Sequence, residues 1–113
     1  MVRRLRQLLT REALQALTSA TTFARGAAYC EQGRVLALTV TDKHLTATVQ
    51  GNQSYQVQFW QRGGTLMFSC TCPFAAEGAC CKHCVAVGLS ELHRRSQEDS
   101  LTANSMIITR ESA

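Results

Sequence analysis

Two pairs of metal-type ligands lie close together in this chain and constrain its fold more than any other feature. The first pair is Cys70 and Cys72, and the second is Cys81 and His83. Residues i and i+2 of an extended strand point to the same face, so both sulfurs of the first pair can approach one ion. Zn–S bonds of about 2.3 Å require such convergence. The first pair is therefore expected at the end of a strand, which Pro73 terminates because it cannot donate to a sheet.

The second pair cannot lie in the middle of a helix. Residues i and i+2 of a regular helix diverge by about 200°. We therefore expect Cys81 at or just before a helix N-terminus, where the positive dipole end stabilises a thiolate, and His83 in the first turn. Together the two pairs predict one structural zinc with tetrahedral coordination by Cys70, Cys72, Cys81 and His83. Soft sulfur with nitrogen favours zinc over magnesium or calcium, and four protein ligands leave no open position for catalysis.

Two further cysteines leave alternatives open. Cys80 adjoins Cys81 and could replace it as a ligand, although the spacing to His83 favours Cys81. Cys81 and Cys84 also have the spacing of a zinc-binding pair, so an all-cysteine site without His83 is one alternative. Disulfide bonds in place of a metal site are another. We expect Cys84 to be a small core residue on the helix.

The cysteine content also bears on the compartment. Six cysteines in 113 residues is an even number, which is compatible with a disulfide framework. The basic start of the chain is interrupted by charges and lacks the apolar region of a secretory signal, so we expect a reducing, cytoplasmic location and metal-binding cysteines. No apolar stretch is long enough for a transmembrane helix.

Apolar periodicity predicts an α+β fold. Spacings of three and four residues predict an amphipathic helix from Val2 to Leu17 and a second helix over 23–32, capped by Thr21 or Thr22 and stopped by Gly33. Alternation then predicts an antiparallel meander of four short strands, with one buried face and one face rich in Thr and Gln. The strands are expected over 35–40, 45–49, 55–60 and 66–68.

The zinc-stabilised finger is expected to lead from this meander into a C-terminal helix. Val85, Leu89 and Leu92 have helical spacing, and basic residues fill the last turn. We divide the chain into an N-terminal amphipathic helix (1–20), a zinc-binding domain (21–95) and a C-terminal tail (96–113).

The cysteine motif resembles the SWIM zinc finger, whose pattern is CxC, a variable gap and CxH. The Cys72-Pro73 step, the Cys81-Lys82-His83 triplet and the apolar residues after it all match. The stretches Arg25–Tyr29 and Glu31–Val35 resemble the lead-in of stand-alone bacterial members, so that the likeness covers about residues 22 to 93. The resemblance implies one zinc on a sheet-plus-helix module that binds DNA or proteins, and it implies no catalytic residue.

Charge and composition leave the type of partner open. A formal net charge of +4 makes an anionic partner possible, but it is below what dedicated DNA-binding proteins usually show. We give DNA and a protein partner similar weight, and we expect no membrane and no small-molecule substrate. The candidate contact residues are Arg3, Arg4, Arg6, Arg11, Lys82, Arg94 and Arg95.

Two other functional classes compete with a binding module. Cys80 and Cys84 lie beside the zinc ligands in sequence, which suggests as an alternative a thiol-based redox switch or a metal-responsive switch. The sequence has no recognisable Ser/His/Asp set, phosphate-binding glycine loop or pair of catalytic carboxylates. We therefore expect that the chain is not an enzyme.

Overall fold

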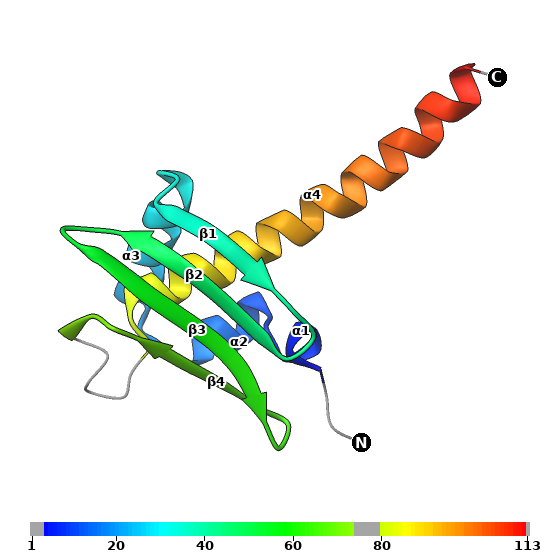
Figure 1. Ribbon diagram of the computed structural model, residues 1–113. Helices are drawn as coiled ribbons and strands as arrows, with labels where there is room; N and C mark the ends of the chain where they lie inside the picture. Colours follow the sequence, from blue (N-terminus) through cyan, green and yellow to red (C-terminus); the bar gives the residue numbers. More distant parts are fainter. Residues whose placement is uncertain (1–3, 74–79, 113) are drawn as a thin grey trace.

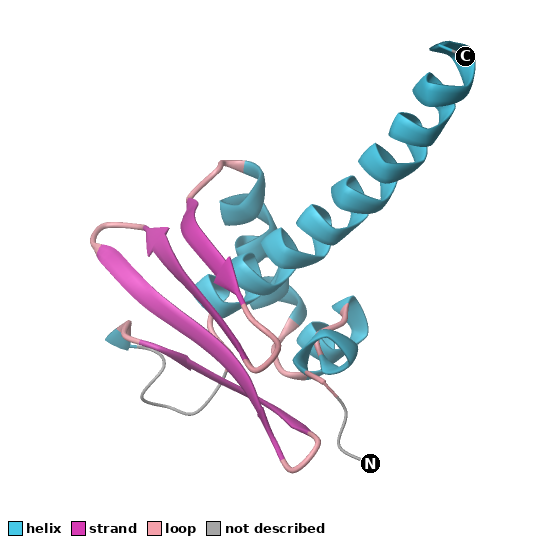
Figure 2. Ribbon diagram, turned by 45° about the vertical axis from the view of Figure 1, so that its right-hand side comes forward, coloured by secondary structure: helices cyan, strands magenta, loops and turns pink. Residues whose placement is uncertain are grey.

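A computed structural model describes residues 4–73 and 80–112, with side chains described as far as Gln97. Four antiparallel strands form one sheet in the order β1-β2-β3-β4, and the helices cover one of its faces (Figures 1 and 2). This α+β architecture is the one predicted. The elements are α1 (Leu5–Leu8), α2 (Arg11–Ala16), α3 (Ala20–Glu31), β1 (Val35–Val40), β2 (His44–Gln50), β3 (Ser54–Arg62), β4 (Thr65–Cys70) and α4 (Lys82–Ser112).

The first predicted helix is divided into two short ones, so the prediction of one continuous helix is wrong. The backbone is extended at Leu9, and Thr10 then caps α2 by accepting a hydrogen bond from the Ala13 amide at 3.0 Å. A threonine hydroxyl that caps a new helix offers the backbone an alternative to continuous helix. Leu5, Leu9 and Leu14 are nevertheless all buried in the main core.

The second helix is longer at its start than predicted. Ser19, rather than Thr21 or Thr22, caps α3 by accepting a hydrogen bond from the Thr22 amide at 3.1 Å. The predicted stop at Gly33 agrees with the structure: its φ of +70° lies in the left-handed region that glycine adopts without strain.

The central strands have the predicted alternation. Leu45 and Val49 of β2 are buried together with Val57 and Phe59 of β3, while Gln56 and its neighbours on the other face are exposed. Leu45 pairs with Phe59, so these side chains form the sheet's contribution to the core.

Strand β1 departs from the predicted alternation. Its register with β2 shifts between Leu36 and Thr39, and Ala37 has a φ of +52°. This bulge places Leu36 opposite Thr48 on the outer face, where its side chain is 48% exposed, while Leu38 packs against the core.

Helix α4 runs from the predicted zinc ligands at its start to the N-terminal helices. It approaches α3 closely at Gly26, where a Cβ atom would overlap the Val85 side chain and lie 2.9 Å from the Lys82 carbonyl oxygen. The tail predicted from residue 96 instead continues this helix to Ser112 and extends beyond the sheet (Figure 1). Within the described part of the chain, none of the helices combines the length and the apolarity needed to cross a membrane.

Candidate metal centre

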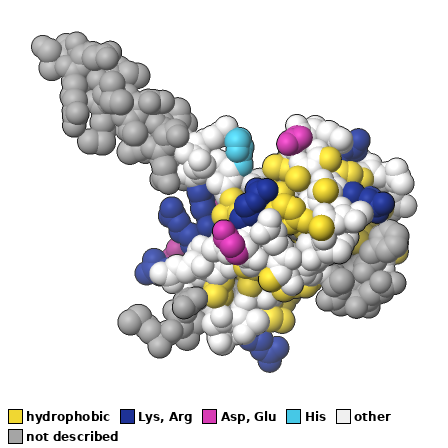
Figure 3. Space-filling model, turned by 180° about the vertical axis from the view of Figure 1, so that it is seen from behind, with side chains coloured by type: hydrophobic (Ala, Val, Ile, Leu, Met, Phe, Trp, Pro, Cys, Tyr) yellow, Lys and Arg dark blue, Asp and Glu magenta, His cyan; other side chains and the backbone are white. Residues whose placement is uncertain are grey.

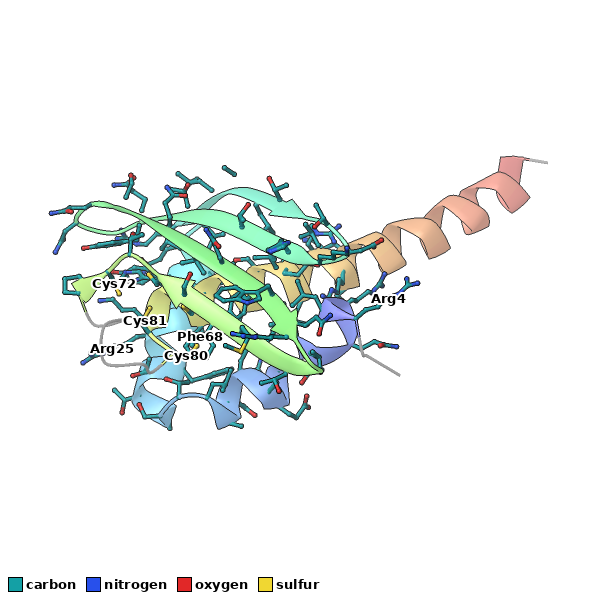
Figure 4. All side chains as sticks on the ribbon, turned by 60° about the horizontal axis from the view of Figure 1, so that its bottom comes forward. Arg4, Arg25, Phe68, Cys72, Cys80 and Cys81 are labelled. Atoms are coloured by element: carbon teal, nitrogen blue, oxygen red, sulfur yellow. The ribbon has the colours of Figure 1, made fainter. Side chains whose placement is uncertain are left out.

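The four predicted ligands come together where β4 ends and α4 begins. The sulfurs of Cys70, Cys72 and Cys81 and a ring nitrogen of His83 all lie within 4.8 Å of one another. Figure 4 shows Cys72 after β4 and Cys81 before α4 on the same side of the sheet. This cluster therefore joins the end of β4 to the start of α4, which are consecutive elements of the chain.

Strand geometry positions the first pair as predicted. Cys70 is the last residue of β4 and pairs with Val57. Thr71 points outward, where its hydroxyl accepts a hydrogen bond from the Gln56 amide at 3.0 Å and its own amide donates to the Gln56 carbonyl at 3.1 Å. This continuation of the β3 pairing turns Cys72 inward, and its side chain is buried.

Helix geometry positions the second pair. Helix α4 begins at Lys82, and the Cys81 carbonyl accepts a hydrogen bond from the Val85 amide at 3.1 Å. Cys81 therefore occupies the N-cap position, and His83 lies in the first turn. The partial positive charge of the helix N-terminus stabilises a thiolate at Cys81.

The His83 imidazole presents its Nδ1 atom to the thiols. Nδ1 lies 3.8 Å from the Cys70 sulfur and 3.8 Å from the Cys81 sulfur. Bonds of about 2.3 Å to sulfur and about 2.0 Å to nitrogen, at tetrahedral angles, separate neighbouring donor atoms by about 3.6–3.8 Å. The two separations from Nδ1 to sulfur are therefore close to those of a tetrahedral zinc site, and the other donor pairs lie within 4.8 Å.

Three residues around the histidine ring were not predicted. The rings of Tyr55 and Tyr29 lie 4.5 Å and 5.6 Å from the His83 ring, centre to centre. A Cβ atom at Gly51 would lie 3.6 Å from His83 Nε2, which is buried and has no hydrogen-bond partner among the described residues. These neighbours fix the ring so that Nδ1, and not Nε2, faces the sulfurs.

Hydrogen bonding among the thiols gives them different acidities. Hydrogen bonds from Cys70 and then Cys84 lower the pKa of the Cys81 thiol well below its usual value. The hydrogen bond between Cys70 and Cys81 raises the pKa of Cys70 to about 12. Cys81 is therefore the thiolate that can attract a cation first, and zinc must then displace the proton of Cys70.

The two additional cysteines have different relations to the four ligands. Cys80 is buried and its sulfur lies 4.0 Å from the Cys81 carbonyl oxygen, so the structure keeps it outside the ligand cluster. Cys84 is also outside that cluster, but its sulfur lies 3.8 Å from the sulfur of Cys81. The donor group nearest to tetrahedral geometry therefore contains His83, as predicted.

The predicted partner-contact residues do not form one surface. Arg3 lies outside the described residues, and Arg4, Arg6 and Arg11 are exposed. Lys82 lies at the metal end, with its ammonium group 5.1 Å from the centre of the Tyr29 ring. Figure 4 places Arg4 at the opposite end of the molecule from the labelled cysteines, and Figure 3 shows basic side chains scattered over the face seen there.

Two of these residues are engaged in internal interactions. Arg95 binds the buried Glu91 carboxylate at 3.0 Å and also donates to the carbonyl oxygens of Arg6 and Leu9. Arg94 binds the same carboxylate at 2.6 Å and 3.1 Å. Both arginines were predicted to be partner contacts, although the spacing from Glu91 to Arg95 is that of a helical ion pair.

Comparison with known proteins agrees with the geometry. Residues 55–89 match the family model described as the SWIM zinc finger. The match spans β3, β4 and the first turns of α4, so it includes all four ligands. Searches of curated proteins and of solved structures found no match. The donor set of three sulfurs and one nitrogen fits a single structural zinc. Residues 55–89 are therefore similar to the SWIM zinc finger, and the four donors that they contain fit one structural zinc.

Proposed function

We propose that this protein is a non-catalytic binding module whose zinc fixes the shape of a surface for a protein partner or for DNA. The closed coordination set carries this proposal. Four protein donors would fill all four coordination positions of a tetrahedral zinc ion. A catalytic zinc, in contrast, keeps one coordination position free for water or substrate. Cys72, Cys81 and His83 are also buried, so the ion joins elements of the fold instead of facing a substrate.

A protein partner is supported by the edge of the sheet. Leu36 and Val40 are the large apolar side chains that stand exposed among the described residues, at 48% and 37%, and both lie on the edge strand β1. The bulge at Ala37 turns Leu36 to the outer face. Apolar side chains on an edge strand supply the contact area that protein interfaces use.

The test of a protein partner compares capture from native extract by the zinc-loaded protein and by two variants. Leu36→Ser with Val40→Thr removes the apolar edge, and Gln56→Ser with Gln58→Ser is the matched change on the exposed face of β3. We expect the first variant to lose a specific band that the second retains. Equal capture by both variants would contradict this surface.

DNA is supported by the cations at the finger end. Arg34 and Lys82 both lie over the Tyr29 ring, at 5.0 Å and 5.1 Å, and Arg25 is exposed on the same helix as Tyr29. Neutralising phosphates would make binding weaken steeply as salt rises. We expect Arg25→Gln to weaken binding of a fluorescent duplex more than Arg4→Gln, which lies at the other end of the molecule. No binding at low salt would exclude DNA.

A second candidate function is a thiol-based redox switch, supported by the 3.8 Å separation of the Cys81 and Cys84 sulfurs. Peroxide would oxidise these two thiols to a disulfide, be reduced to water, and release zinc. This function requires a reducing compartment such as the cytoplasm. Reversible zinc release by mild peroxide would support it, and full retention of zinc would exclude it.

A further inference from the structure

Cys84 is a further thiol beside the centre, and it contacts one of the ligands that His83 contacts. Its sulfur lies 3.8 Å from the sulfur of Cys81. His83 Nδ1 lies at the same distance, 3.8 Å, from the Cys81 sulfur. The Cys81 sulfur is therefore flanked by two alternative donors, one nitrogen and one sulfur.

Both alternatives belong to the first turn of α4. Cys81 and Cys84 are three residues apart, a spacing that brings side chains together on one face of a helix. The Cys84 side chain is only 1% exposed, and its thiol contacts the Ser69 carbonyl oxygen at 3.8 Å. The Cys84 thiol is thus held beside the metal centre, and when it is not a ligand the Ser69 carbonyl oxygen can weakly accept its proton.

We propose that the finger has a second mode of metal binding, in which a thiophilic ion softer than Zn²⁺ is held by the thiolates of Cys70, Cys72, Cys81 and Cys84. Zinc accepts imidazole and thiolate alike, whereas softer ions favour ligand sets made of sulfur. In the exchange Zn²⁺ is released, and the bond between zinc and His83 Nδ1 breaks. Cys84 gives up its proton, which the freed imidazole or water accepts.

This second mode changes the surroundings of the histidine. Release of Nδ1 frees the ring that packs between Tyr29 and Tyr55 and allows it to reorient. The inference goes beyond the proposed binding function and rests on the metal centre alone. It would remain valid whether the partner is a protein, DNA or neither.

The direct test uses the full-length protein loaded with ¹¹³Cd²⁺ as the probe. Scalar couplings between ¹¹³Cd and protons identify the ligands without any substitution. We expect couplings to the β-protons of Cys70, Cys72, Cys81 and Cys84 and none to the His83 ring. Couplings to the His83 ring with none to Cys84 would overturn the second mode, while leaving the zinc assignment intact.

A pair of variants provides an independent measurement. Cys84→Ala removes one of four thiolates and should lower the cadmium–sulfur charge-transfer absorbance at full occupancy by about a quarter, with little change in zinc affinity. Cys80→Ala is the matched control, because Cys80 is adjacent in sequence to Cys81 and equally buried. Equal absorbance in the two variants would overturn the proposal. If Cys84→Ala does not fold, the couplings of the wild-type protein decide.

Discussion

Helix α4 is attached to the rest of the molecule at two places that differ in where the positive charge comes from. At its start, three thiols and an imidazole converge on a position that needs a cation from outside the chain. Two turns further on, the buried Glu91 carboxylate is neutralised by Arg94 and Arg95 from the same helix. The first attachment depends on metal supply, whereas the chain itself supplies both charges of the second.

The second attachment also holds the N-terminal segment. Glu91 is 1% exposed, and Arg95, at 13%, donates to the carbonyl oxygens of Arg6 and Leu9 beyond its ion pair. These two carbonyls belong to the last turn of α1 and its end, which lack partners within the helix. Metal therefore holds the finger together, while Arg95, which is paired with Glu91, holds α1 against α4.

Loss of zinc should have the largest effect. A Cys70→Ser, Cys81→Ser double variant forfeits a binding free energy on the order of 10–16 kcal/mol, comparable to or larger than the stability of a typical small domain. We expect thermal unfolding followed by circular dichroism to show a non-cooperative or absent transition. Cys30→Ala removes a thiol outside the ligand cluster and should retain both zinc and the transition. A double variant that unfolds like the wild type would refute this dependence.

Loss of the buried carboxylate should have an intermediate effect. Glu91→Gln leaves two guanidinium groups without their anion, and we expect the free energy of unfolding to fall by about 3 kcal/mol. Zinc content, measured by elemental analysis, should stay at one ion per chain. Glu12→Gln alters an exposed carboxylate and should change stability by less than about 0.5 kcal/mol. A Glu91 variant that loses zinc as readily as the double cysteine variant would remove the distinction between the two attachments.

Crowding where α3 meets α4 should have a smaller effect. An alanine at Gly26 would overlap Val85 and approach the Lys82 carbonyl at 2.9 Å, so we expect a loss of about 1–3 kcal/mol despite the better helix propensity of alanine. At Gly88 the three atoms nearest to an added Cβ all belong to the Leu14 side chain, the closest being a terminal methyl group at 2.7 Å, so Gly88→Ala should cost less. Denaturant titration would measure both. The reverse order would show that α3 does not fix the start of α4.

A fall in pH should weaken the two attachments in different ranges. Because the pKa of Cys70 is about 12 without zinc, binding at neutral pH releases its proton, and zinc affinity should fall about tenfold per pH unit for each proton displaced. Burial raises the pKa of Glu91, but hydrogen bonds and charges from Arg94 and Arg95 outweigh it and bring the pKa below its ordinary value of 4.5. The stability that ionised Glu91 contributes is therefore fully present above about pH 4.5, and it is lost only as the pH falls through the lowered pKa of the folded protein.

Zinc affinity and metal-saturated stability measured between pH 5 and pH 7 would therefore separate the two effects. We expect affinity to fall in this range while the stability contribution of Glu91 is unchanged. Parallel loss of both would contradict the separate titration of the two attachments.

Local spacing predicted the metal centre, because strand and helix geometry fix how residues two apart are oriented. The meander was predicted from alternation for the same reason. The bulge at Ala37 was missed, since a shift of register leaves no mark in an apolar pattern, and the break at Thr10 was hidden within one continuous apolar stripe. The closeness of Gly51 to His83 was also missed, because it depends on tertiary packing.

X-ray absorption at the zinc edge tests the central claim most directly. For protein purified with its native metal, the account predicts one zinc per chain with three sulfurs at about 2.3 Å and one nitrogen at about 2.0 Å. A protein without stoichiometric zinc, or a zinc bound by four sulfurs or by a water oxygen, would contradict it.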